Sequence, residues 1–164
     1  MTSPQQSTRT ATVTTPAERE IRIERLFDAP RERVFGVYID PELVPEWWGP
    51  RDSTTTVDVM EPKTGGTWRF VATGSDGSET AFRGTYREIT PHDRIVQTFE
   101  WEGMPGHISV ETAEFEDVGE QTRVVTTSVF HTAEERDGML GSGMEKGMNE
   151  TYQRLDELLE RLGA

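Results

Sequence analysis

The strongest constraint on the fold is the order of two hydrophobic patterns: a series of alternating segments precedes one helical stripe at the C-terminal end. In TWRFVAT, residues 67–73, Trp68 and Phe70 alternate with Arg69 and Val71, which is the two-residue period of a strand. The later stripe has the three- or four-residue spacing of an amphipathic helix, through Met144, Met148, Tyr152, Leu155, Leu159 and Leu162. The order predicts a series of strands followed by one long C-terminal helix.

The predicted strands lie close together along the chain. Their connections at 74–77, 91–93 and 117–119 are short and rich in Gly, Asp or Pro, which is typical of an antiparallel meander. The sequence predicts strands over residues 20–27, 54–60, 67–73, 79–90, 94–101, 107–115 and 121–130.

Two short helices are predicted between the first strand and the second. Pro30 suits the first turn of a helix that runs to Tyr38. Asp40-Pro41 repeats this start signal, with Asp40 as N-cap, for a second helix that runs towards Trp48 and ends at Gly49-Pro50.

The C-terminal helix has its own start signal. Thr132 and Glu135 match a capping box, in which each side chain satisfies a free backbone amide. Four glycines weaken the first half of this helix, either to let it approach the sheet closely or to kink it and open a cavity; they are Gly138, Gly141, Gly143 and Gly147.

Residues 1–19 differ in composition from the rest, which forms one predicted domain over 20–164. They are rich in Thr, Ser and Gln and contain no aromatic side chain, so we expect a disordered leader. They also lack the apolar stretch of a secretory signal, and the expected location is the cytoplasm.

Composition excludes several classes of site and partner. The absence of cysteine excludes disulfides, thiolate metal sites and a cysteine nucleophile. The 17 basic and 30 acidic residues give a formal charge of −13, which argues against nucleic acid and anionic membranes as partners. No apolar run is long enough for a membrane-spanning helix, so no membrane insertion is expected.

Several short motifs, in this order, resemble one known family. They include Arg25-Leu26-Phe27-Asp28-Ala29-Pro30, Asp40-Pro41-Glu42-Leu43 leading to Trp47-Trp48-Gly49-Pro50, Gly65-Gly66-Thr67-Trp68-Arg69-Phe70 and Gly84-Thr85-Tyr86-Arg87-Glu88-Ile89. Over about residues 20–162 the sequence resembles the branch of the START-like, Bet v 1-like (SRPBCC) superfamily that is named after the activator of Hsp90 ATPase (Aha1-like). The resemblance implies an α+β helix-grip fold, with a curved antiparallel sheet of about six to seven strands around a long C-terminal helix.

The same resemblance implies an apolar cavity between the sheet and that helix. Aromatic and methionine side chains on the surrounding elements suit a flat or apolar ligand. The predicted ligand-binding residues are Trp48, Trp68, Phe70, Phe82, Phe99, Trp101, His131, Met139, Met144 and Met148. The favoured function is therefore non-catalytic binding of a small apolar or aromatic molecule, without a cofactor, a metal or a catalytic residue.

Two other functions remain open at this point. A polyketide cyclase or aromatase-like enzyme predicts an inward polar cluster such as His131, Gln97 and Arg69. A partner of an Hsp90-type chaperone predicts a large exposed apolar patch. Both a monomer and a homodimer are compatible with the sequence.

One metal site is also conceivable. If the last two strands turn near residues 117–119, His107 faces Phe130 or His131, and Glu111 is a nearby carboxylate. Polar residues at strand ends are the simpler interpretation.

Overall fold

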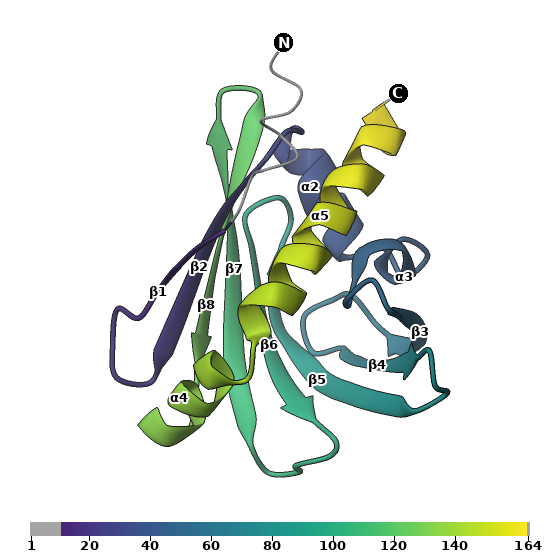
Figure 1. Ribbon diagram of the computed structural model, residues 1–164. Helices are drawn as coiled ribbons and strands as arrows, with labels where there is room; N and C mark the ends of the chain where they lie inside the picture. The colour runs from purple at the N-terminus through teal and green to yellow at the C-terminus, as the bar shows by residue number, and fades with distance from the viewer. Residues whose placement is uncertain (1–10, 164) are drawn as a thin grey trace.

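A computed structural model describes residues 11–163, in which eight antiparallel strands form one curved sheet. The strand order is β1-β2-β8-β7-β6-β5-β4-β3, so the first long strand lies beside the last one. The long helix α5 crosses the concave side of the sheet diagonally (Figure 1). The predicted helix-grip fold is confirmed, with one strand more than expected.

The element bounds follow the hydrophobic patterns of the sequence closely. The strands are β1 (Thr12–Thr14), β2 (Glu20–Phe27), β3 (Ser53–Met60), β4 (Thr67–Gly74), β5 (Glu79–Thr90), β6 (Arg94–Trp101), β7 (Ile108–Val118) and β8 (Gln121–Val129). The helices are α2 (Arg31–Tyr38), α3 (Val44–Trp47), α4 (Ala133–Gly141) and α5 (Met144–Gly163).

The helices α2 and α3 pack at one end of the sheet. Phe35 and Tyr38 of α2 place their rings 5.2 and 5.1 Å from the ring of Phe115 on β7, in edge-to-face geometry. The indole Nε1 of Trp47 donates a hydrogen bond to the Val37 carbonyl at 3.0 Å. These contacts tie both short helices to the core.

The first strand in the chain, β1, lies where the sequence predicts no regular structure. Thr12–Thr14 pair with residues 22–24 of β2, and the backbone of Arg19 accepts a hydrogen bond from the Phe130 amide at 2.8 Å. Backbone pairing with the edge of β2 needs few apolar side chains, which is why the polar composition was misleading. The disorder predicted for residues 1–10 stays a prediction, because those residues lie outside the described part.

Two of the predicted helices also differ from their predicted bounds. The second short helix covers only Val44–Trp47, because Asp40 forms a turn in which its Oδ1 accepts from the Glu42 amide at 2.9 Å. The predicted C-terminal helix is split into α4 and α5 at Gly143, whose φ is +81°. A positive φ cannot continue a right-handed helix, so of the two roles considered for the glycines the kink is correct here.

The capping box at the start of α4 is half formed. The Thr132 hydroxyl accepts a hydrogen bond from the Glu135 amide at 3.1 Å. The Glu135 carboxylate instead lies 3.0 Å from Nδ1 of His107, the residue before β7. Among residues 11–163, no helix is both long and apolar enough to cross a bilayer.

Candidate functional site

A pocket of about 350 Å³ lies between the concave side of the sheet and the helices that cover it. Its walls come from β2, β4–β8, α2–α5 and the segment after α3. The lining residues are Ile21, Ile23, Tyr38, Val44, Trp47, Trp48, Gly49, Phe70, Tyr86, Ile95, Gln97, Phe99, Ser109, Glu111, Ala113, Thr126, Ser128, Phe130, Met139, Met144, Met148, Thr151 and Tyr152.

One wall of the pocket is aromatic and consists of two layers of rings, one that lines the pocket and one behind it. Trp48 places its ring 5.2 Å from that of Phe70 and 5.3 Å from that of Phe82. Behind the lining, Phe82 lies 5.4 Å from Phe99, and Trp68 lies 4.8 Å from Phe70. Edge-to-face and tilted contacts of this kind fix ring orientation, so this wall is rigid.

A second part of the lining is made of methionines around the break between α4 and α5. Met139 precedes Gly143, whereas Met144 and Met148 follow it, and all three line the pocket. The left-handed backbone at Gly143 turns the chain so that methionines from both helices face the same space. Unbranched thioether side chains adapt to ligands of different shape, so this wall is the adaptable one.

The sheet wall carries a polar row within otherwise apolar surroundings. Strand pairing places Tyr86 opposite Gln97, Gln97 opposite Glu111, and Glu111 opposite Ser128. Successive side chains on one strand point to opposite faces, so these four share the concave face with the lining residues of the neighbouring rows. Four adjacent strands thus present a hydroxyl, an amide, a carboxyl and a second hydroxyl to the pocket.

Glu111 is the one acidic side chain that lines the pocket in the part of the chain described here. Burial raises its pKa from the usual 4.5 to about 7, although the Ser128 hydroxyl, 3.5 Å from Oε2, opposes the shift. Lys, Arg and His are missing from the lining within residues 11–163. The pocket therefore combines an apolar surface with one carboxyl group that titrates near neutral pH.

Two tyrosines from the covering helices face the same region. Burial raises the pKa of Tyr38 well above its usual value and raises the pKa of Tyr152 to about 12. The negative charge of Glu111 also raises both, so the three groups lie within electrostatic reach of one another. Both phenols remain neutral hydrogen-bonding groups at neutral pH.

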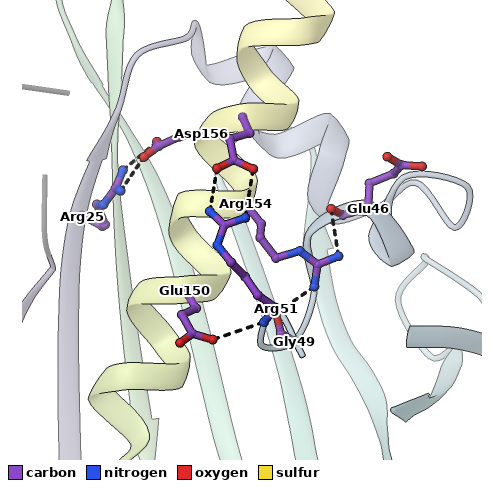
Figure 2. Close-up of polar contacts among 8 residues, drawn as sticks. Arg25, Glu46, Gly49, Arg51, Glu150, Arg154 and Asp156 are labelled. Carbon is purple, nitrogen blue, oxygen red and sulfur yellow. Dashed lines mark hydrogen bonds and ion pairs between the residues drawn. The ribbon is translucent and has the colours of Figure 1, made fainter. Parts of the chain in front are cut away.

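The rim of the pocket at the segment after α3 is fastened to α5 by arginines. Figure 2 shows Arg154 reaching from α5 towards α3 and the segment that follows it. Its guanidinium donates at 2.9–3.4 Å to the backbone carbonyls of Pro45 and Glu46 in α3 and of Trp48, Gly49 and Pro50 after it. Arg51 extends the contact, since its Nη2 lies 2.5 Å from Glu157 and its backbone amide donates to Glu150 at 3.2 Å. The position of Trp48 thus depends on side chains of α5.

The family of the chain follows from comparison with known sequences. Residues 28–160 match the family described as activator of Hsp90 ATPase homolog 1-like protein. The chain belongs to this family. No curated protein sequence matches it.

Several solved structures have the same fold. A crystal structure of a Rhodobacter sphaeroides protein is similar with a TM-score of 0.88 and 26% identity, over 93% of this chain and 99% of that one. A solution structure of an Arthrobacter aurescens protein reaches 0.83 at 27% identity, over 92% and 91% of the two chains. The AHSA1 protein of Silicibacter pomeroyi, at 20% identity and a TM-score of 0.73 over 87% and 99%, shows the same fold.

In this AHSA1-like chain, six of the ten residues predicted to bind a ligand line the pocket. They are Trp48, Phe70, Phe99, Met139, Met144 and Met148. Their roles in ligand binding remain predictions, but the fold brings them together around one space.

The other four predicted residues lie elsewhere. Trp68 and Phe82 form the layer behind the aromatic wall. Trp101 ends β6 beyond the pocket, with 43% of its surface exposed, and its ring packs so closely on Gly103 that a Cβ there would lie 2.4 Å away. His131 is exposed after the end of β8, and its neighbour Phe130 lines the pocket instead.

The polar clusters considered from the sequence are not formed. Arg69 lies outside the pocket, with its Nε 2.7 Å from Glu102, so it does not join Gln97 and His131 in an inward cluster. His107 is half exposed and pairs with Glu135 rather than with His131. Residues 11–163 hold no group of three or more acidic or histidine side chains arranged to bind a metal.

Gln97 lines the pocket, as the enzyme alternative expected, whereas Glu111 was considered only as a metal ligand and the tyrosines Tyr38, Tyr86 and Tyr152 were not predicted. Strand parity carries the missing signal, because Gln97 shares a face with Phe99, and Glu111 shares one with Ala113 and Phe115. The register between β7 and β8, which places Val110 opposite Val129, was needed to bring Ser128 into the same row.

Proposed function

We propose that this protein binds a small apolar or aromatic molecule in the pocket between α5 and the sheet. The pocket volume of about 350 Å³ carries the proposal. Ligand sites in proteins measure roughly 300–1,000 Å³ and combine apolar walls with a few polar groups. The aromatic wall, the methionine wall and the polar row supply these features here.

The arrangement of rigid and adaptable walls supports binding rather than mere packing. Side chains that only fill a core leave few voids larger than a water molecule. Here Trp48, Phe70 and Phe99 meet Met144 and Met148 across a space that no side chain of residues 11–163 fills.

Native mass spectrometry of protein purified from its own host tests the proposal. A retained small molecule that is released on denaturation is expected. The matched control is a variant with the pocket filled, Ala113→Phe, which should lack the additional mass. Unliganded spectra from both proteins, together with no binding of apolar probes, would refute the proposal.

A second candidate is binding to an Hsp90-type chaperone. The family description and a group of exposed apolar side chains near the β6–β7 connection favour it; the group comprises Trp101, Met104 and Ile108, each 43–50% exposed. Purified chaperone should then bind wild type and not Met104→Asp. Equal binding of both, or none, would remove this candidate.

A further inference from the structure

Glu111 lies in the middle of the sheet wall, where a carboxylate is costly. Burial of an ionised group is tolerated when an opposite charge or several hydrogen bonds compensate it. In residues 11–163, the carboxylate receives one hydrogen bond, a long one of 3.5 Å from the Ser128 hydroxyl, and no cation pairs with it. Because Glu111 lines the pocket, a ligand there can supply further hydrogen bonds to the carboxylate.

The groups around Glu111 offer hydrogen bonds but no positive charge. Gln97 on β6 and Ser128 on β8 flank it in the sheet, and Tyr38 of α2 and Tyr152 of α5 interact with it electrostatically from the helices. Arg25, which interacts electrostatically with both tyrosines, donates to the Asp156 carboxylate through hydrogen bonds of 2.8 and 2.6 Å.

The rest of the pocket also favours a cation over an anion. Trp48, Phe70 and Phe99 present ring systems, whose faces attract positive charge. The formal charge of −13 adds a negative potential that raises the local concentration of cations and repels carboxylates. An anionic ligand such as a fatty acid would meet Glu111 without any basic group to neutralise it.

We infer that the ligand of this pocket is an apolar or aromatic amine whose protonated nitrogen binds to the Glu111 carboxylate. This inference rests on the proposed function and specifies its ligand class. The apolar part of the amine packs between the aromatic wall and the methionine wall. Gln97 and Ser128 accept the remaining hydrogens of the nitrogen.

The titration of Glu111 makes binding of an amine dependent on pH. In the protein without ligand, the pKa of Glu111 is about 7, so the carboxyl group is largely protonated at pH 5 and largely ionised at pH 8. Only the ionised form pairs with an ammonium group. Tyr38 and Tyr152, which face it from the helices, and Tyr86 on the sheet have raised pKa values and stay neutral in this range. Arg25 pairs with Asp156. Affinity for an amine should therefore rise from about pH 5 to pH 8, whereas affinity for a neutral isostere should change much less.

Three probes of the same shape separate charge from apolar contact: naphthylethylamine, naphthylethanol and naphthylacetic acid. Isothermal titration calorimetry should give the order amine, alcohol, acid, with the amine at least about tenfold tighter than the alcohol. In Glu111→Gln this preference should disappear while the alcohol binds as before. Glu114→Gln, on the opposite face of β7, is the matched control and should behave as wild type.

The outcomes also separate this inference from the function on which it rests. Equal affinities for amine and alcohol, or tightest binding of the acid, would overturn the inference and leave apolar binding intact. If none of the three probes binds to wild type, both the inference and the binding function fail. The pH profile of wild type keeps the test decisive even if Glu111→Gln does not fold.

Discussion

Arg25 on β2 and Asp156 on α5 form a two-bond ion pair that joins the sheet to the helix. The Arg25 side chain is 1% exposed, and its two terminal nitrogens lie 2.8 and 2.6 Å from the carboxylate oxygens (Figure 2). The guanidinium also lies 4.7 Å from the centre of the Phe27 ring. This pair fixes the part of α5 that follows Tyr152, the last residue of the helix that lines the pocket.

Removal of the charge of either Arg25 or Asp156 should lower the free energy of unfolding. Asp156→Asn leaves the Arg25 charge buried without a counter-charge, so the free energy of unfolding should fall by about 2–4 kcal/mol in urea titrations. The control Glu157→Gln breaks the exposed pair with Arg51 and should cost about 1 kcal/mol or less. Similar losses in both variants would mean that burial of Arg25 does not strengthen its pairing.

Arg154 should hold the segment after α3 against the pocket. Arg154→Ala removes the donors to five carbonyls between residues 45 and 50, so hydrogen–deuterium exchange in the peptide that contains Trp48 and Ser53 should become faster. Arg161→Ala, which breaks an exposed pair with Glu46, is the control and should leave that exchange near wild type. Unchanged exchange in Arg154→Ala would contradict this role.

Glu111 should make stability depend on pH. Its folded pKa of about 7 exceeds the usual 4.5, so the folded state holds the proton more tightly than the unfolded chain. The contribution is complete below pH 4.5 and is lost as the pH rises through 7. Relative to Glu111→Gln, the free energy of unfolding of wild type should fall by up to about 3 kcal/mol between pH 4 and pH 8.

Urea titrations at several pH values measure this difference, and Glu114→Gln is the control for loss of an acidic side chain on β7. Parallel pH profiles for wild type and Glu111→Gln would show that burial of Glu111 does not perturb its titration.

Filling the pocket should abolish binding without loss of the fold. Ala113 is 9% exposed and faces the pocket, so Ala113→Phe places a ring in the ligand space. Naphthylethanol should then no longer quench tryptophan fluorescence, at a stability cost of about 1–3 kcal/mol from overpacking. Ala81→Phe, opposite Val71 on the other face of the sheet, should keep binding; equal binding by both variants would place the probe elsewhere.

The fold could be predicted because its signals are local and repeated. Alternation around Trp68 and Phe70 defines a strand, and the spacing from Met144 to Leu159 defines a helix. The strand Thr12–Thr14 could not be found in this way, because its one apolar residue, Val13, gives no period, and its pairing depends on the edge of β2.

The pocket was harder to predict because it depends on register and on where elements end. Trp101 has the strand parity of Phe99, but β6 ends there, so Trp101 is exposed. The polar row through Gln97, Glu111 and Ser128 exists only because three strands pair in one register. A pattern within one segment cannot contain that information.

The binding claim can be tested most directly by NMR of the methionine methyl groups during titration with the three naphthyl probes. For each probe that binds, the methyl signals of Met139, Met144 and Met148, which line the pocket, should shift and should give the same dissociation constant as one another. Met60 and Met104 lie outside the lining and serve as internal controls that should stay in place. Absence of shifts with all three probes, or equal shifts at all five methionines, would contradict the account.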